Sequence, residues 1–538
     1  MLSTFTNFFL TAFSILLVLL ILELLGFFIL KKPEKIDLSK ILLLILLAVV
    51  SLQCFFALWN PVWTNGDEPH YLLVASSLIQ DRDLTLKNNY DARDYYPHHG
   101  SYIDPHVFVG KDGTHKPFHG ILLSFLLVPG YYFLGLEGAR FGMQILFILS
   151  LVFLYLIQRQ LGFSKNISLL SLVIYSLQAP IFVYSSSLYP DLLMGNIVVA
   201  GIFLALEATK TKKNYLFVLS GFLMGISVFL HFKILAYIFY AILPILFLSY
   251  KNNKFEFYDL SNILAQALVK FSFAKKFFPN IENKNTSNLS QKTNTNPEFD
   301  QKKVLKKALY ILSPIIFFTF LLCSLGYYWF GYFRPDYMTP FLTSEVYLGY
   351  GNPINNTVAN LLDYDRGIFW HGPLLIFLIP GLFVWFKKNR TSFICLAIPS
   401  FIYLLNAMLF KEWTAGWAPI GRYVMTSLPI ISLAFPYLFE EFKNSKVFRL
   451  SLLPFLLLNL LFIAIIFAKN YVGYPTGSYN FFFNEIFSFL KIQQLQKVLD
   501  INILKGGNFA LSKAYLILIS LIAFSYFLVN KKFSSKKV

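Results

Sequence analysis

Residues 41–71 read ILLLILLAVVSLQCFFALWNPVWTNGDEPHY, an apolar run that is followed directly by an acidic turn. The run at 41–59 is long enough to cross a bilayer as a helix. Two adjacent acids, Asp67 and Glu68, follow it and open a polar loop that reaches His119. A carboxylate against hydrocarbon is costly unless it faces water, a cation or a substrate, so its position marks this pair as functional candidates. The alternative is that the two acids cap the next helix in a solvated loop.

The composition of the whole chain is that of a membrane protein. Its 538 residues are 56% hydrophobic and 14% charged, and the mean hydropathy is +0.58. The formal net charge of +18 comes from Lys and Arg in short loops between apolar runs. This distribution follows the positive-inside rule and argues against a nucleic-acid-binding protein. Three cysteines, Cys54, Cys323 and Cys395, each lie within an apolar run, which argues against a disulfide framework or a thiolate metal site.

The apolar runs predict an all-α integral membrane protein with about thirteen transmembrane helices. The predicted spans lie near 8–30, 41–59, 139–158, 167–184, 192–209, 214–232, 235–250, 308–332, 372–386, 391–410, 423–439, 450–468 and 514–530. The run at 8–30 precedes Lys31 and Lys32 rather than a cleavage site, so we expect it to remain as an uncleaved span. With these lysines in the cytoplasm, alternation places every short basic loop on the cytoplasmic side. The acidic, aromatic and histidine-bearing loops then face the outside.

The pattern divides the chain into two membrane modules. Residues 1–250 form the N-terminal module, with a first outer loop at 60–118. The apolar segment that follows, 119–135, is broken by Pro129 and Gly130. Counting it as a span would invert all later loops, so we predict an interfacial helix on the outer face.

A polar segment separates this module from the second. Residues 251–307 are basic and Asn-rich, which predicts a cytoplasmic, partly disordered linker. Residues 308–538 form the C-terminal membrane module, with outer loops at 333–371 and 469–513.

Five short motifs occur in a fixed order in the first half of the chain. They are Gly66-Asp67-Glu68-Pro69, Lys116-Pro117-Phe118-His119, Gly138-Ala139-Arg140-Phe141, Tyr189-Pro190-Asp191, and the run from Gly221 through Gly225 to Lys233. Their order and predicted outer-face positions resemble the C-type glycosyltransferase superfamily, particularly the branch of protein O-mannosyltransferases and lipid A aminoarabinose transferases. The resemblance covers about residues 40–250. The second half matches only in outline, through Arg366-Gly367 and the segment from Gly416-Trp417 to Gly421-Arg422-Tyr423.

The chain departs from the family pattern in three respects. Phe118 stands where the family more often has a second proline, and an additional N-terminal span precedes the usual first one. The second half also lacks a clear acceptor-binding domain, which leaves the acceptor class open.

The resemblance implies transfer of a sugar from a polyprenyl-phosphate carrier, with inversion at the anomeric carbon. Asp67 is then the catalytic base, and we expect its proximity to the membrane to raise its proton affinity. Glu68 is the second catalytic candidate; it orients the acceptor, shares a metal ion or is simply solvated. The donor phosphate needs cations to hold it as it leaves.

Three cations near predicted span ends are candidates for binding that phosphate: Lys233, Arg422 and Arg140. The planar guanidinium of Arg422 suits a phosphate better than an ammonium does. The alternative for each cation is contact with lipid headgroups.

Other side chains are expected to line the outer cavity or to contact the acceptor: Asp191, Tyr71, Lys116, His119, Arg366 and His371. Six of the 8 histidines fall in the first outer loop or, in the case of His119, directly after it, among several aspartates. A divalent metal site is therefore one interpretation, with Glu68, Asp191 and His70 as candidate ligands. The spacings match no zinc signature, and polar loops also gather histidines without metal.

The expected partners are a polyprenyl-phosphate-linked sugar, an extracytoplasmic glycan, lipid or protein acceptor, and membrane lipids. We expect a multi-pass protein of a membrane such as the bacterial inner membrane, with the active site on the extracytoplasmic face. A flippase for lipid-linked sugars, or another transporter, is the main alternative. It predicts charges along the spans, which here carry few, such as Glu23 and Glu207. A non-catalytic scaffold leaves the ordered motifs unexplained.

Overall fold

The computed structural model describes most of the chain. Its described residues are 38–59, 63–237, 301–334, 351–409, 414–416, 418–468, 481–490 and 503–534. The predicted span at 8–30 and most of the span at 235–250 lie outside these ranges. So do most of the predicted linker and parts of the two later outer loops.

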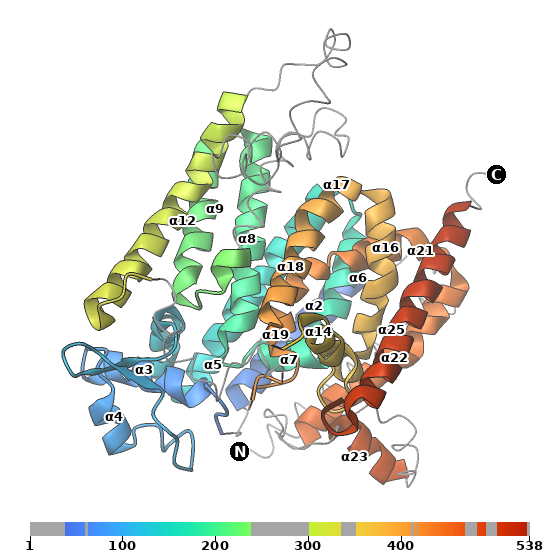
Figure 1. Cartoon of the computed structure of the whole chain (residues 1–538). Coiled ribbons are helices and arrows are strands. Elements are labelled where there is room, and N and C mark those ends of the chain that lie inside the picture. The colour runs from blue at the N-terminus through green and yellow to red at the C-terminus, as the bar shows by residue number, and fades with distance from the viewer. Residues whose placement is uncertain are drawn as a thin grey trace.

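The described chain is almost entirely helical (Figure 1). The helices of the first half are α2 Leu38–Trp59, α3 Glu68–Gln80, α4 Lys87–Ala92, α5 Ile121–Gln160, α6 Lys165–Ser176, α7 Ala179–Tyr184, α8 Pro190–Thr211, α9 Asn214–Ile226 and the 3-10 turn η1 Ser227–Phe229. The strands of a short hairpin are β1 Val107–Val109 and β2 His115–Pro117.

The second half continues with helices of very unequal length. They are α12 Gln301–Phe330, α14 Pro353–Leu362, α15 Ile368–His371, η3 Pro373–Phe377, α16 Leu378–Lys388, α17 Arg390–Ser392, η4 Phe393–Ala397, α18 Ile398–Ala407, α19 Arg422–Met425, α20 Leu428–Ile431, α21 Ala434–Phe442, α22 Lys446–Ala468, α23 Phe481–Leu490 and α25 Ile503–Ser534. Helix α12 begins at Gln301, so its first turns lie within the segment predicted as linker.

Seven helices in the described part of the chain are long and apolar enough to cross a membrane. They are Leu38–Trp59, Ile121–Gln160, Pro190–Thr211, Lys306–Phe330, Arg390–Ala407, Lys446–Phe467 and Ala510–Asn530. The chain is therefore a multi-pass integral membrane protein, as the composition predicts. Each of these helices contains or overlaps a predicted span.

Three other predicted spans are not continuous helices. Residues 167–184 are divided between α6 and α7, and residues 423–439 between α19, α20 and α21. Residues 372–386 begin as the 3-10 turn η3 before α16. Prolines stand at the start of α7, η3 and α20. Because proline lacks an N–H and clashes with the preceding turn, it breaks a helix that apolar composition alone would extend.

Helix α5 contains the predicted interfacial segment and the span that follows it. Its backbone leaves the helical conformation at Gly135, where φ is 62° and ψ is −142°. Glycine adopts such a positive φ without steric cost. The segment before Gly135 therefore has its own direction. The helix continues through Pro129 and Gly130, where the sequence predicted a break, and the place of this segment at the membrane surface stays a prediction.

Packing between the two halves builds one apolar core. Helix α5 packs against α2, α3 and α8, and α12 of the second half packs along α9 of the first. Farther along, α16 packs against α21 and α25. Most buried apolar residues of both halves belong to a single cluster.

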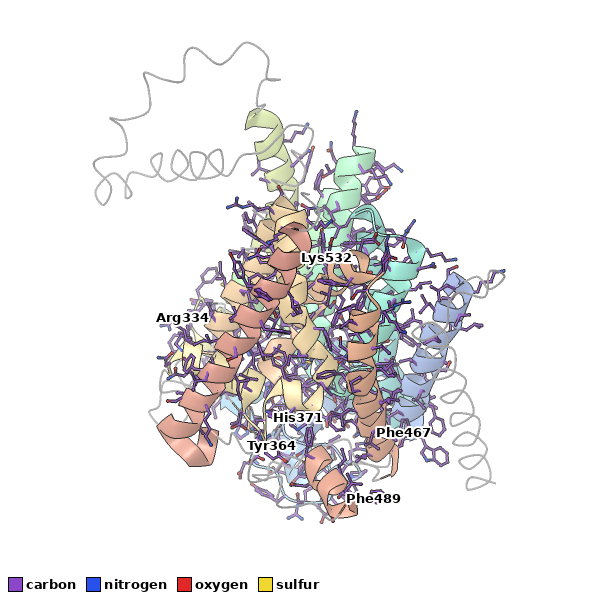
Figure 2. All side chains as sticks on the ribbon, turned by 90° about the vertical axis from the view of Figure 1, so that its right-hand side faces the viewer. Arg334, Tyr364, His371, Phe467, Phe489 and Lys532 are labelled. Carbon is purple, nitrogen blue, oxygen red and sulfur yellow. The ribbon has the colours of Figure 1, made fainter. Side chains whose placement is uncertain are left out.

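The two ends of the helix bundle differ in what they carry. Helices α3 and α4 lie with the hairpin at one end, and α17 lies at the other (Figure 1). His371 lies toward the end that holds Phe489, whereas Lys532 lies toward the opposite one (Figure 2). The predicted outer loops and the predicted basic cytoplasmic loops therefore separate to opposite ends.

The hairpin of the first outer loop is attached to a helix of the second half. Its strands pair antiparallel with Phe108 opposite Lys116. At its tip, the Lys111 N–H donates to the Trp329 carbonyl at 2.8 Å, and the rings of Phe108 and Phe330 meet edge to face at 5.9 Å. The base of this hairpin holds two histidines of the site below.

Candidate active site

The acidic turn is built by glycine and ends at the start of α3. Gly66 adopts a φ of 53°, which glycine tolerates better than any other residue. Asp67 occupies the N-cap position of α3, but its side chain makes no capping hydrogen bond. The carboxylate therefore does not serve as a helix cap and is turned to other partners.

Those partners join three segments that are far apart in sequence. Nη1 of Arg422 lies 2.7 Å from Oδ2 of Asp67, and Nε of Arg422 lies 2.9 Å from Oδ2 of Asp191. The Asp67 and Arg422 side chains are only 17% and 15% exposed. We call Asp67, Asp191 and Arg422 the ion triad. Its geometry lets one guanidinium pair with two carboxylates largely away from solvent.

This arrangement reverses the proton affinity expected for Asp67. Burial alone would raise the pKa of Asp67, but Arg422, and then His119 and His106, outweigh it and hold the pKa well below its usual range. The expectation of a raised proton affinity is therefore wrong for this state of the protein. Burial of Asp67 raises the free-energy cost of its charge, but the ion pair with Arg422 more than offsets that cost.

The Glu68 side chain bonds to the backbone of the acidic turn and of the neighbouring segment rather than to Arg422. Its side chain accepts hydrogen bonds from two backbone N–H groups, that of Leu188 at 2.9 Å and that of Asn65 at 3.0 Å. Glu68 is 2% exposed, and Arg140 is completely buried. Burial raises the pKa of Glu68, while the Arg140 charge opposes that rise. The two hydrogen bonds give Glu68 a structural role in the turn, while contacts of Glu68 with an acceptor and of Arg140 with the donor phosphate stay predictions.

Tyr189 links the same segments a second time. Its hydroxyl donates to the Asn65 carbonyl at 2.8 Å and accepts from the Asp67 N–H at 3.2 Å. The guanidinium carbon of Arg422 lies 4.9 Å from the centre of its ring. Sequence reasoning assigned no role to this residue. The available signal was its place directly before Pro190 and Asp191.

A row of histidines adjoins Asp67 on the side of the hairpin. Nε2 of His119 lies 3.9 Å from Oδ1 of Asp67 and 2.9 Å from Nδ1 of His106. The ring of His70 stacks on that of His106 at 3.8 Å. His70 in turn pairs with the Tyr90 hydroxyl at 2.7 Å. His106 was not among the predicted site residues, because only the hairpin brings it to His119.

Three of these side chains can hold a metal ion. One ligand atom each from Asp67, His106 and His119 lies within 4.8 Å of the others. Two imidazoles and one carboxylate are a donor set that zinc accepts. Burial lowers the pKa of His106, and it lowers the pKa of His119 to about 4 against the opposing effect of Asp67. Both imidazoles are thus in the neutral form that binds metal.

The predicted metal ligands are therefore not the residues that cluster. Glu68 is engaged by backbone N–H groups, Asp191 by Arg422, and His70 by Tyr90. Among the described residues, only Asp67, His106 and His119 form a group of metal-binding side chains.

Lys233 lies near the triad and lines a cavity. Its ammonium is 5.2 Å from the ring centre of Tyr423, the neighbour of Arg422. Burial and the Arg422 charge lower the pKa of Lys233 to about 8, although Asp191 and Asp67 raise it. The cavity has a volume of about 260 Å³ and is lined by Phe232, Lys233, Leu235, Ala236, Tyr403, Asn406 and Ala407. A cation at the edge of an apolar cavity suits a ligand with an anionic head and a hydrocarbon tail.

The remaining predicted residues lie at different distances from this centre. The Tyr71 ring is 4.9 Å from that of His119, whereas the Lys116 ammonium donates to Thr85 within the first outer loop. His371 is completely buried, and its Nδ1 lies 3.0 Å from the Gly367 carbonyl. The segment from Arg366 to His371 reaches the site through Ile368.

That contact is direct. The Ile368 side chain lies against Gly421, the residue before Arg422. The second-half outer loop therefore flanks the ion triad, while contacts of Arg366 and His371 with an acceptor stay predictions.

Comparison with known proteins gives a match to part of the chain. Residues 130–272 match the family described as dolichyl-phosphate-mannose-protein mannosyltransferase. The matched range contains Arg140, Asp191 and Lys233. Over this range it confirms the resemblance to the C-type glycosyltransferases. No curated protein matches the sequence.

Solved structures with a similar arrangement include ArnT from Cupriavidus metallidurans and an oligosaccharyltransferase from Archaeoglobus fulgidus. ArnT bound to undecaprenyl phosphate is 11% identical, with a TM-score of 0.46 over 90% of this chain and 75% of that chain. Apo ArnT is 10% identical, with a TM-score of 0.45 over 75% and 60% of the two chains. The apo oligosaccharyltransferase is 14% identical, with a TM-score of 0.39 over 91% and 56%. The chain thus spans less than two thirds of the apo ArnT and oligosaccharyltransferase chains.

Proposed function

We propose that this protein is a membrane glycosyltransferase that transfers a sugar from a polyprenyl-phosphate donor to an extracytoplasmic acceptor. The observation that carries the proposal is the ion triad, in which Arg422 joins Asp67 to Asp191 beside Lys233 and its cavity. A base, two cations and an apolar cavity are what transfer from a lipid phosphate requires. The partial family match supports the same chemistry.

Lys233 and Arg422 hold the donor phosphate in this proposal. The cavity beside Lys233 takes the first part of the prenyl chain, and the phosphate oxygens accept hydrogen bonds from the two cations. Arg422 then exchanges the Asp67 carboxylate for the phosphate and keeps its pair with Asp191. This exchange removes the main influence that keeps the pKa of Asp67 low.

Asp67 acts as the base in the transfer step. It takes the proton from the acceptor hydroxyl or amide while the acceptor atom forms a bond to the anomeric carbon. The bond from that carbon to the phosphate oxygen breaks, and polyprenyl phosphate leaves with the electron pair. In-line attack from the opposite face inverts the anomeric carbon.

Asp191 and Glu68 support this step without taking part in the bond changes. Asp191 keeps Arg422 in place once Asp67 has been released. Glu68 holds the turn that carries Asp67 through its bonds to Asn65 and Leu188. Asp67, His106 and His119 are the residues that would hold a metal ion, which would supply positive charge at the site when bound.

The membrane arrangement that we propose has thirteen spans and an interfacial helix before Gly135. The exposed side chains of Phe125, Tyr132 and Phe133 suit immersion of this helix in the outer surface of the membrane. The active site then faces the extracytoplasmic side of a membrane such as the bacterial inner membrane. The acceptor, whether glycan, lipid or protein, approaches from that side.

Replacement of Asp67 by Asn tests the proposal. The amide keeps the size of the side chain and an acceptor for Arg422 but cannot take a proton. We expect transfer from a panel of radiolabelled polyprenyl-phosphate sugars to fall by about three orders of magnitude or more, while the variant still folds and inserts into the membrane. Normal transfer by this variant would refute the role of Asp67.

A folded wild-type protein that consumes no donor would instead favour the transporter. That alternative is measured directly by movement of a labelled lipid-linked sugar across proteoliposomes.

A further inference from the structure

Tyr189 occupies a position that the transfer chemistry does not yet explain. It is completely buried and is the last extended residue before α8, with φ −114° and ψ 140°. The extended conformation follows from Pro190, which disfavours the helical region for the residue before it. Tyr189 therefore stands between the acidic turn on one side and Asp191 on the other.

The hydroxyl of Tyr189 is fully used by the acidic turn. It donates to the Asn65 carbonyl at 2.8 Å and accepts from the Asp67 N–H at 3.2 Å. These bonds cross from the second outer loop to the first. Next to them, Leu188 donates to Glu68, so two consecutive residues hold the turn that carries Asp67.

The ring of Tyr189 supports the cation. The guanidinium carbon of Arg422 lies 4.9 Å from its centre, while the guanidinium edges are taken by Asp67 and Asp191. An aromatic face attracts a guanidinium more strongly where water is excluded. When Arg422 gives up a carboxylate for another anion, the ring contact can remain.

We propose that Tyr189 is the positioning residue that aligns the base with the phosphate-binding cation. Its hydroxyl fixes the backbone that carries Asp67, and its ring keeps the Arg422 guanidinium in position to bind the donor phosphate. This inference rests on the proposed function of the ion triad. It adds that one side chain sets the distance between the Asp67 carboxylate and the Arg422 guanidinium.

The two functions of Tyr189 can be separated by substitution. Tyr189→Phe removes both bonds to the turn and keeps the ring, so we expect kcat to fall about tenfold to a hundredfold with KM for the donor nearly unchanged. Tyr189→Leu removes the ring as well. We expect it to lower kcat similarly and also to weaken binding of a short-chain polyprenyl phosphate by about fivefold or more. Tyr189→Met, whose longer, unbranched side chain can follow more of the length of the lost ring, serves where the leucine variant does not fold.

The matched control is Tyr437→Phe. Tyr437 is also buried and its hydroxyl pairs with Ser392 at 3.1 Å, in α21 and outside the site. We expect this variant to keep wild-type kcat, KM and polyprenyl phosphate affinity. Thermal unfolding of all variants in detergent shows whether each is folded.

The outcomes are distinct. Wild-type kcat in Tyr189→Phe would overturn the inference, as would equal losses of donor affinity in the Phe and Leu variants, which indicate a general structural role. If the wild-type protein transfers no sugar, the proposed function fails. The binding measurement then still decides: affinity for polyprenyl phosphate that is kept in the Phe variant and lost in the Leu variant supports the ring contact, and any other pattern overturns it.

Discussion

The Asp67 carboxylate shows how opposing influences on one residue are decided. Its burial costs free energy, and an ion pair with Arg422 at 2.7 Å offsets that cost. Glu68, the next residue, accepts hydrogen bonds from two backbone N–H groups, and the charge of Arg140 also favours its ionised form. Adjacent acids therefore have different tasks, because successive residues at a helix start point in different directions.

Glu68→Gln is a prediction at this scale. The amide retains one acceptor oxygen but turns an NH2 group toward a backbone N–H that Glu68 now satisfies. We expect a loss of stability of about 1–3 kcal/mol, seen as a lower thermal unfolding temperature in detergent. Asp67→Asn, measured beside it, should stay folded but also unfold at a lower temperature than the wild type, because the amide loses the charge that pairs with Arg422. A Glu68→Gln variant that is fully stable yet inactive would instead indicate a chemical role for Glu68.

At the scale of elements, the hairpin decides which histidines meet. His106 precedes β1 and His119 follows β2, and the Phe118 N–H donates to the His106 carbonyl at 3.1 Å. Antiparallel pairing thus places Nδ1 of His106 2.9 Å from Nε2 of His119 at the base of the hairpin. The third outer-loop histidine in contact, His70, comes from α3 and stacks on His106.

This arrangement predicts zinc binding. We expect protein that has been treated with chelator to bind one Zn²⁺ per chain, measured by titration calorimetry. His106→Gln and His119→Gln should bind it about tenfold more weakly or worse, since each removes one of three ligands. His115→Gln, in β2, is the control and should bind as the wild type does. Equal zinc affinity in all four proteins would exclude this cluster as the metal site.

The bend within α5 brings two glycines, Gly130 and Gly138, close together. A Cβ atom on Gly138 would overlap the Gly130 carbonyl, whereas a Cβ atom on Gly142 would meet nothing within 4 Å. The segments of α5 before and after the bend at Gly135 therefore lie so close here that their backbones are in contact. This approach also fixes the start of the segment that carries Arg140.

Gly138→Ala tests this close approach. The added methyl group forces the segments apart, and we expect a loss of about 1–3 kcal/mol in stability. Gly142→Ala in the same helix should be neutral or slightly stabilising, because alanine is the better helix former. Thermal unfolding of the two variants in the same detergent makes the comparison. Equal unfolding temperatures would show that the segments separate freely.

At the scale of the whole molecule, the two ends of the bundle have separate chemistry. Helices α3 and α4 lie with the hairpin at one end, and α17 lies at the other (Figure 1). The attachment of the hairpin to Trp329 joins the first outer loop to the second membrane module. The site is thus assembled only when both modules are packed together.

The topology gives a prediction of its own. We expect Asp112→Cys, at the exposed hairpin tip, to react with a membrane-impermeant maleimide added to intact cells. Lys443→Cys, exposed after α21, should react only after permeabilisation. Two native cysteines, Cys323 and Cys395, are buried, which limits the background reaction. Labelling of Lys443→Cys in intact cells would contradict the predicted orientation.

The sequence by itself determined that this is a multi-pass helical membrane protein, and which segments gather at each end. These properties follow from hydropathy and from the side of each lysine, and both are local in the chain. It also singled out Asp67, Asp191 and Arg422 one by one, through their positions next to apolar runs. It missed the breaks in the predicted spans at 167–184, 372–386 and 423–439, where prolines override composition.

The tertiary structure alone decided how the site residues are paired. Arg422 and Asp191 are separated by 231 positions in the chain, and no local pattern relates them. Their contact depends on how α8 and α19 pack, as does the position of Tyr189 beneath Arg422. The net effect on the pKa of Asp67 follows from this pairing and not from the residue's own surroundings in sequence. Helix packing sets those distances, and a single sequence does not display it.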